Sequence, residues 1–266
     1  MTYNSENSIQ RSIREAKKIT KDIIVVDSFS TDNTIKICKK FKCKLFQRKF
    51  INYSNQRNWI IDKINSKYEW QLHLDADEII DKKLIKSINT ILHNKKKNNC
   101  FLIKKKYYFL NKLLNYPGLN QWHLRLFRSK TSKCENRSYD QHFITRHKIQ
   151  YIQSGSIHDL EKISLTRWKE KHLIWAKMEA NEIYKQKNKN NTKFFAKNDL
   201  RLKTRRYKNL YYNLPYLIRP FLYFLYRYFY KGSFKDGKTG FMFSYYQSLW
   251  FRIHVDLYIL KNKIKF

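Results

Sequence analysis

Acidic residues are scarce in this chain of 266 residues. It has 21 Asp and Glu against 56 Lys and Arg, which gives a formal charge of +35 at pH 7. A surface this basic attracts polyanions, which include nucleic acid, anionic lipid and phosphorylated sugar carriers. The charge alone does not indicate which of these polyanions is bound. A second explanation of the charge is base composition, because an AT-rich coding sequence also produces many Lys, Asn and Ile residues.

Cysteine is also scarce, and the four cysteines are scattered. They are Cys38, Cys43, Cys100 and Cys134. No C-x-x-C spacing occurs, so neither a zinc site nor a disulfide framework is indicated, and a reducing cytosol fits best. The opening residues, "MTYNSENSIQRSIREAKK", lack the apolar stretch of a signal peptide.

The chain lacks an uninterrupted apolar run long enough to cross a membrane, which requires roughly 20 residues. The segment "LPYLIRPFLYFLYRYFYKG" is broken by Arg219, Pro220 and Arg227, and "FMFSYYQSLWFRIHVDLYIL" carries Arg252 and Asp256. Aromatic residues with cations favour contact with the surface of an anionic membrane. The alternative is that both segments are helices packed against the rest of the protein.

The chain does have alternating short apolar runs and amphipathic segments, with 42% hydrophobic and 17% aromatic residues. This pattern predicts an α/β sheet covered by helices in residues 1–160 and a helical region in residues 161–266. Strands are expected at 22–28, 44–48, 69–74, 100–110, 123–129 and 148–154, and helices near 34–42, 52–64, 84–92 and 164–186.

One acidic group stands out in this basic chain. In "WQLHLDADEII", Asp75 and Asp77 directly follow a predicted strand. Ligands of open α/β sheets bind beyond the carboxyl ends of the strands. Two carboxylates one residue apart can share a Mg²⁺ or Mn²⁺ ion and hold it against diphosphate oxygens. An acidic surface turn is the alternative reading.

Three blocks together resemble a known family. "DIIVVDSFSTDNTIKICKKF", "FQRKFINYSNQRNW" and "EWQLHLDADEII" are similar in order and spacing to family 2 glycosyltransferases, especially the branch that builds lipopolysaccharide core and other bacterial surface polysaccharides. The resemblance implies a GT-A fold, a Rossmann-like mixed α/β sheet, here with a helical C-terminal appendage. It also implies inverting sugar transfer from a nucleotide-diphosphate donor, by default a UDP-sugar.

The same resemblance implies an acceptor and a location. The acceptor would be a lipid-linked glycan or lipopolysaccharide core. The protein would be cytoplasmic and peripheral on the inner face of the plasma membrane, bound to its anionic surface, with no nucleic-acid partner. The alternatives left open are an inactive GT-A-like scaffold and a basic protein that binds nucleic acid or another polyanion.

The family's site residues can be matched to positions in this chain. The resemblance implies donor binding by Asp27, Gln56, Arg57, Asn58 and Asp75. It implies Mg²⁺ or Mn²⁺ binding by Asp75, Asp77 and His158, with Asp77 as the more direct ligand and Asp75 nearer the ribose. Asp140, in "SYDQHF", is the candidate general base that takes the proton of the attacking hydroxyl.

One departure from the family concerns the start of the chain. Members normally open with a strand and a "TYNE"-like loop, whereas this chain opens at "MTYNSEN". The first strand is therefore expected to be missing, and Tyr3 and Asn4 are expected to lose the strand that positions them.

Overall fold

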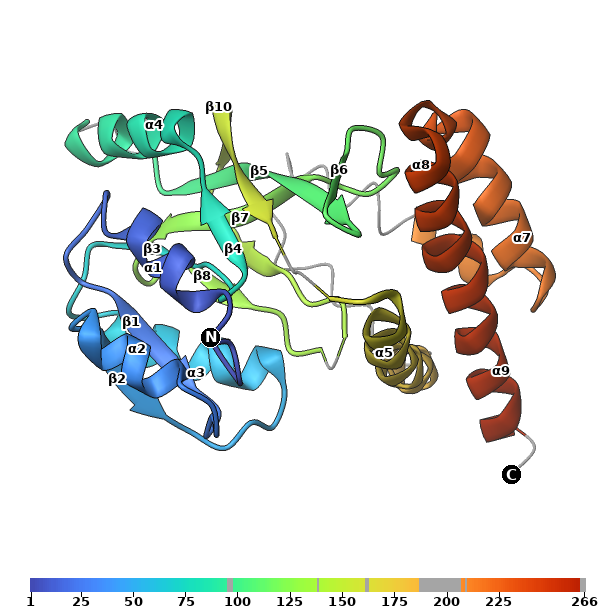
Figure 1. Cartoon of the computed structure of the whole chain (residues 1–266), viewed down its shortest axis with the longest axis horizontal. Helices are drawn as coiled ribbons and strands as arrows, with labels where there is room; N and C mark the ends of the chain where they lie inside the picture. Colours follow the sequence, from blue (N-terminus) through green and yellow to red (C-terminus); the bar gives the residue numbers. More distant parts are fainter. Residues whose placement is uncertain (95–97, 138, 161–162, 187–206, 209, 264–266) are drawn as a thin grey trace.

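The computed structural model describes residues 1–94, 98–137, 139–160, 163–186, 207–208 and 210–263. Three sheets and their covering helices form one side of the molecule, and a group of helices forms the other (Figure 1). The predicted α/β class with a helical C-terminal region is therefore confirmed.

A small parallel sheet occupies the N-terminal part of the fold. Strands β1 (Ile24–Asp27) and β2 (Lys44–Gln47) pair in register from Ile24 with Lys44 to Asp27 with Gln47. Helices α1 (Ile9–Ala16), α2 (Thr34–Lys40) and α3 (Tyr53–Ile64) lie around it. Asn52 begins α3 by accepting a hydrogen bond from the backbone N–H of Asn55 at 2.8 Å.

The opening residues are better ordered than the sequence predicts. Thr2 forms a parallel bridge with Asp27, and the backbone N–H of Thr2 donates to the carbonyl of Val26 at 3.0 Å. The side chain of Asn4 accepts from the backbone N–H of Thr31 at 2.8 Å. Asn4 is thus held by the loop after β1, and the expectation of a missing first strand stays a prediction. Tyr3, by contrast, is exposed.

A six-stranded mixed sheet forms the centre of the molecule, in the order β3-β7-β5-β10-β4 with β6 beside β5. Only β5 and β10 run parallel, and the other pairs are antiparallel. The strands are β3 (Trp70–Leu72), β4 (Glu78–Ile80), β5 (Cys100–Phe109), β6 (Lys112–Leu114), β7 (Trp122–Arg128) and β10 (Ile149–Asp159).

Each face of this sheet buries its own apolar cluster. Helix α4 (Lys82–His93) packs Leu84 and Ile88 against one face. On the other face Ile61 of α3 packs with the two-stranded sheet of β8 (Ser132–Cys134) and β9 (Phe143–Thr145). The site-bearing loop between β3 and β4 is thus attached to a sheet packed on both faces.

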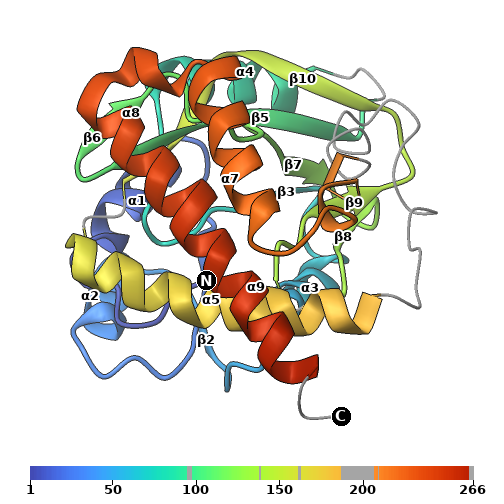
Figure 2. The same ribbon diagram turned by 90° about the vertical axis from the view of Figure 1, so that its right-hand side faces the viewer.

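The C-terminal region is helical, as predicted. It contains α5 (Leu165–Gln186), α7 (Ile218–Leu225), α8 (Gly237–Ser244) and α9 (Phe251–Lys263), with π-helical turns η1 (Tyr226–Tyr230) and η3 (Tyr245–Trp250) and the 3₁₀ turn η2 (Ser233–Asp236). Figure 2 shows α7, α8 and α9 together on one side of the molecule. Among the described residues, no helix combines the length and apolar character needed to cross a membrane.

The helical region and the sheet share part of their core. Phe109 and Leu114, from β5 and β6, pack with Trp168 of α5 and Phe243 of α8. A second cluster joins α5 to α9 through Ala176, Ala180 and neighbouring apolar side chains. The expected division at residues 160 and 161 stays a prediction, and it falls next to the end of β10 at Asp159.

Candidate functional site

The loop between β3 and β4 fixes the first of the two predicted carboxylates. The backbone N–H of His73 donates to the carbonyl of Arg125 at 2.9 Å, which keeps the loop beside β7. The backbone N–H of Asp75 donates to Glu78 Oε2 at 2.9 Å, and that of Glu78 donates to the Asp75 carbonyl at 3.1 Å. These reciprocal bonds close a tight turn with Asp77 inside it.

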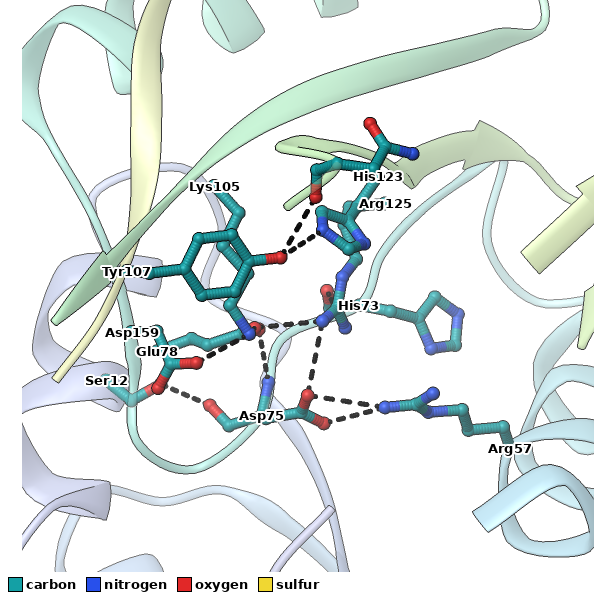
Figure 3. Close-up of polar contacts among 11 residues, drawn as sticks. Ser12, Arg57, His73, Asp75, Glu78, Lys105, Tyr107, His123, Arg125 and Asp159 are labelled. Atoms are coloured by element: carbon teal, nitrogen blue, oxygen red, sulfur yellow. Dashed lines mark hydrogen bonds and ion pairs between the residues drawn. The ribbon is translucent and has the colours of Figure 1, made fainter. Parts of the chain in front are cut away.

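Two arginines hold the Asp75 carboxylate, as Figure 3 shows. Arg57 Nη2 lies 3.0 Å from Asp75 Oδ1, and Arg125 Nη2 lies 3.2 Å from Oδ2. Burial acts to raise the pKa of Asp75, but the charges of Arg57 and Arg125 outweigh it and hold this pKa well below its ordinary value. Asp75 is therefore ionised at neutral pH, and its orientation is set by α3 and β7.

A second layer of charges lies behind Asp75. Glu78 is completely buried, and its Oε1 lies 2.9 Å from Arg125 Nη2 and 2.7 Å from Lys105 Nζ. Lys105 also pairs with Asp159 at 2.8 Å. Burial acts to lower the pKa of Lys105, but Glu78 and Asp159 raise it well above its ordinary value. Cations and carboxylates thus alternate from Arg57 to Asp159.

Sequence reasoning missed two members of this network, Lys105 and Asp159. Both lie inside strands, where neither forms a recognisable motif with Asp75. The signal is in the pairing register, which sets Asp159 directly opposite Glu78 across β10 and β4. Arg125 joins this network, whereas Arg128, three residues further along β7, points to the opposite face. Arg128 instead pairs with Glu69 at the other end of the strand.

Aromatic and imidazole groups lie next to the charged network. The Tyr107 hydroxyl is 2.8 Å from His123 Nε2 and 3.1 Å from the carbonyl of Asn120 (Figure 3). The His73 ring stacks on Phe127 with ring centroids 5.1 Å apart. Burial lowers the pKa of His73 to about 3, so this ring is neutral at physiological pH.

Asp27 and Gln56 both lie at the end of β1. Asp27 is fully buried, and its carboxylate accepts from the backbone N–H of Ser30 at 2.9 Å and from the Ser30 hydroxyl. Gln56 Nε2 donates to Ser28 Oγ at 3.1 Å. Gln56 Oε1 is buried and has no hydrogen-bond partner in the part of the chain that the structure describes. A buried acceptor of this kind is suited to a donor group on a ligand.

These two predicted residues adjoin the Asp75 network. Gln56 and Arg57 are consecutive on α3, so one helix carries both the amide at the end of β1 and the guanidinium on Asp75. The structure therefore brings Asp27, Gln56, Arg57 and Asp75 near the carboxyl ends of β1 and β3. Their roles in donor binding stay predictions.

Asn58 does not join this group. Its side-chain Nδ2 donates to the carbonyl of Cys134 at 2.9 Å, and its Oδ1 accepts from the backbone N–H of Cys134 at 2.8 Å. Both polar atoms therefore hold β8 against α3. The predicted donor contact of Asn58 gains no support from this geometry.

His158 has contacts outside the charged network. Its ring contacts the Tyr108 hydroxyl at 2.9 Å and Asp81 Oδ2 at 3.4 Å, next to the beginning of α4. Successive residues of a strand point to opposite faces. Because Asp159 points into the charged network, His158 points away from it. The structure does not place His158 where the predicted metal set requires it.

A divalent ion would therefore rely on the two aspartates. No group of three or more His, Cys, Asp or Glu residues positioned to hold a metal occurs among the described residues. A Mg²⁺ ion in a diphosphate site needs only one or two protein carboxylates, because phosphate and water oxygens complete its shell. Asp75 and Asp77 fit that smaller requirement, although the arginines already occupy both oxygens of Asp75.

The predicted base, Asp140, lies in an ion pair. Its Oδ2 is 2.9 Å from Lys208 Nζ, and its Oδ1 is 3.5 Å from His142 Nε2. Burial acts to raise the pKa of Asp140, but Lys208 and His142 hold it well below its ordinary value. A carboxylate with so low a pKa is a weak proton acceptor, so this arrangement opposes base catalysis while Lys208 stays in place.

Known proteins resemble this chain in sequence. Residues 1–151 match the family described as Glycosyl transferase family 2. Uncharacterized glycosyltransferases of Rickettsia conorii and Rickettsia typhi are each 33% identical to it over 106 residues, which is 39% of this chain. The matched stretch spans only 37% and 36% of those two relatives.

One solved structure shares the fold at low sequence identity. It is the mannosyltransferase PcManGT from Pyrobaculum calidifontis, in complex with GDP-Man and Mn²⁺. Its TM-score is 0.54 at 12% identity, covering 99% of this chain and 84% of that protein. The likeness supports the predicted GT-A fold, and the family match covers more than half of the chain. The chain belongs to glycosyl transferase family 2.

Proposed function

We propose that this protein is an inverting glycosyltransferase that moves a sugar from a nucleotide-diphosphate donor to an acceptor hydroxyl. The observation that carries the proposal is the Asp75 turn, where a carboxylate held by Arg57 and Arg125 precedes Asp77 at the end of β3. This end also holds Asp27 and Gln56, with the buried free acceptor atom of Gln56. Family membership supports the same reaction class.

Each part of the site has a role in the proposal. Asp27 and Gln56 would accept hydrogen bonds from the nucleoside, and Asp75 would do so from the ribose. Arg57 and Arg125 keep Asp75 ionised and oriented, and their charge also favours the diphosphate. A Mg²⁺ or Mn²⁺ ion on Asp77 would offset charge on the departing diphosphate.

The proposal also names an acceptor, a general base and a default donor. We infer a lipid-linked glycan or lipopolysaccharide core as acceptor, in bacterial surface polysaccharide synthesis at the inner face of the plasma membrane. Asp140 is the proposed base, and it becomes effective only when Lys208 moves away from it. A UDP-sugar is the default donor.

The test is metal-dependent release of nucleoside diphosphate by purified protein. UDP-, GDP- and ADP-sugars are supplied with and without Mn²⁺, and the melting temperature is recorded with each donor. The proposal expects one donor to be turned over and to raise the melting temperature. Silence across the panel in both assays would contradict it and favour an inactive scaffold.

Asp77→Asn is the decisive variant in the same assay. Metal stabilisation of the transition state contributes several kcal/mol, so we expect kcat/KM to fall about 100-fold or more. The matched control is Asp62→Asn, which changes an exposed carboxylate of α3 and should leave turnover within about twofold. Equal activity of the two variants would show that the Asp77 carboxylate is not required for turnover.

A further inference from the structure

Helix α7 and the turn η1 reverse the usual polarity of a surface helix. Their buried positions include two arginines, Arg219 and Arg227, which are 1% and 0% exposed. In a water-facing helix the apolar side chains face inward and the charges face outward. Here the charges face inward, so the outward face needs a separate explanation.

The buried arginines anchor this segment to the rest of the protein. Arg219 Nε donates to Asp256 Oδ1 of α9 at 2.9 Å, and its Nη1 donates to the carbonyl of Tyr212 at 3.0 Å. Arg227 Nε donates to the carbonyl of Pro117 at 2.7 Å, and its Nη1 donates to Ser248 Oγ at 2.9 Å. These bonds fix which face of the segment points outward.

The outward face is apolar and aromatic. Its exposed residues recur at helical spacing and are called the aromatic face here: Ile218, Phe221, Leu222, Tyr226, Phe229 and Tyr230. Phe229 and Tyr230 are 61% and 77% exposed. Phe241 of α8 is also exposed, and its ring centroid lies 5.6 Å from that of Tyr228 in η1. Contiguous apolar exposure of this kind marks an interaction surface.

The charges around the aromatic face have one sign. Lys231, Lys235 and Lys238 are exposed in the segment that follows it. Lys231 Nζ lies 5.6 Å from the Tyr226 ring centroid. The one acidic residue between positions 213 and 246 is Asp236, and its carboxylate accepts the backbone N–H of Tyr116 at 2.8 Å. The surface therefore presents rings and cations together.

We propose that the aromatic face inserts into the headgroup region of an anionic phospholipid bilayer, with the three lysines on lipid phosphates. Rings with an apolar body, beside cations, are the side chains that bind this interface. Insertion is shallow, since no described helix is long and apolar enough to span. The inference uses no residue of the transferase site, and it specifies the surface by which the proposed enzyme would reach a lipid-borne acceptor.

Flotation of the purified chain with vesicles tests this inference. The vesicles contain equal parts of phosphatidylcholine and phosphatidylglycerol, and a second set contains phosphatidylcholine alone. We expect wild-type protein to float with the anionic vesicles and to float much less with the neutral set or at high salt. Wild-type protein that stays at the bottom of the gradient with anionic vesicles at low salt would overturn the inference.

Two double variants distinguish membrane binding by the aromatic face from non-specific binding through other exposed apolar side chains. Phe229→Ser with Tyr230→Ser should lower the partition coefficient about tenfold or more, since both rings lose their apolar burial. The control is Phe50→Ser with Ile51→Ser, which removes two exposed apolar side chains from the loop before α3. Equal flotation of the two variants would contradict the assignment.

Two further measurements keep the result interpretable. Circular dichroism and melting temperature show whether each variant is folded, and the donor-dependent melting shift reports the transferase site independently. Light scattering tests the other occupant, a second copy of the chain. A dimer that Phe229→Ser with Tyr230→Ser dissociates, together with wild-type protein that does not float, would assign the face to self-association instead.

Discussion

Glu78 is the residue on which the charged network depends. Its completely buried carboxylate contacts both Arg125 and Lys105. Desolvated ions of this kind are tolerated only when each has a partner. Removing the negative charge would leave two buried cations facing each other, with Asp75 and Asp159 as their remaining partners.

The variant Glu78→Gln should therefore be strongly destabilised, by about 3–5 kcal/mol in the free energy of unfolding. The matched control is Glu69→Gln, because Glu69 pairs with Arg128 but its side chain is 69% exposed. That change should cost no more than about 0.5 kcal/mol. Urea unfolding followed by circular dichroism measures both, and comparable losses would show that burial does not set the strength of the network.

The sequence predicts some residues of the candidate site and misses others. Asp27, Gln56, Arg57 and Asp75 lie in the blocks that resemble the family, and the structure places them near one another, while their roles stay predictions. Lys105 and Asp159 were not predicted, since their contact depends on how β10 aligns with β4 and β5. Strand alternation turns Asp159 toward Lys105 and His158 toward Asp81, so the metal role of His158 stays a prediction that this geometry does not support.

Among the elements, the long periodic segments were predictable, and short strands were predictable only where an apolar run marks them, as at β1 (Ile24–Asp27) and β3 (Trp70–Leu72). The predicted helix at 164–186 corresponds to α5 (Leu165–Gln186), and the strand at 100–110 corresponds to β5 (Cys100–Phe109). Strands β4, β6, β8 and β9 have three residues each and were missed. Three residues carry almost no periodicity, so only pairing with a neighbour defines them.

Helix α5 is joined to the last helix through a buried charge. Glu179 Oε1 lies 2.8 Å from Arg252 Nη1 of α9 and 2.9 Å from Lys208 Nζ. Burial acts to raise the pKa of Glu179, but Arg252 and Lys208 lower it to about 2. Because the folded pKa lies below the ordinary value of 4.5, this interaction stabilises the protein above pH 4.5. The stabilisation is lost as the pH falls from 4.5 toward 2.

Glu179→Gln should remove that pH dependence. We expect the difference in unfolding free energy between wild type and variant to be on the order of 3 kcal/mol at pH 7 and to shrink steadily below pH 4.5. Urea titrations at several pH values measure it, with the exposed Glu170→Gln on the same helix as control. A difference that stays constant down to pH 2.5 would show that the Glu179 charge is not coupled to folding.

Across the whole molecule, Lys208 links the predicted base to the helical region. Its Nζ lies 2.9 Å from both Asp140 Oδ2 and Glu179 Oε1. No sequence pattern indicates this contact, because it joins residues 68 positions apart. It makes the protonation of Asp140 depend on how the C-terminal helices are packed.

Lys208→Met tests whether that link controls catalysis. Burial with less opposing positive charge would raise the pKa of Asp140 toward or above its ordinary value. If Asp140 is the base, the acidic limb of the kcat/KM profile should then move to higher pH, because that limb reports the base in the free enzyme. Lys208→Arg keeps the charge and should leave the limb in place. An acidic limb that is identical in wild type and Lys208→Met, with Asp140→Asn still active, would assign proton removal to another group and leave Asp140 as an anchor for the C-terminal helices.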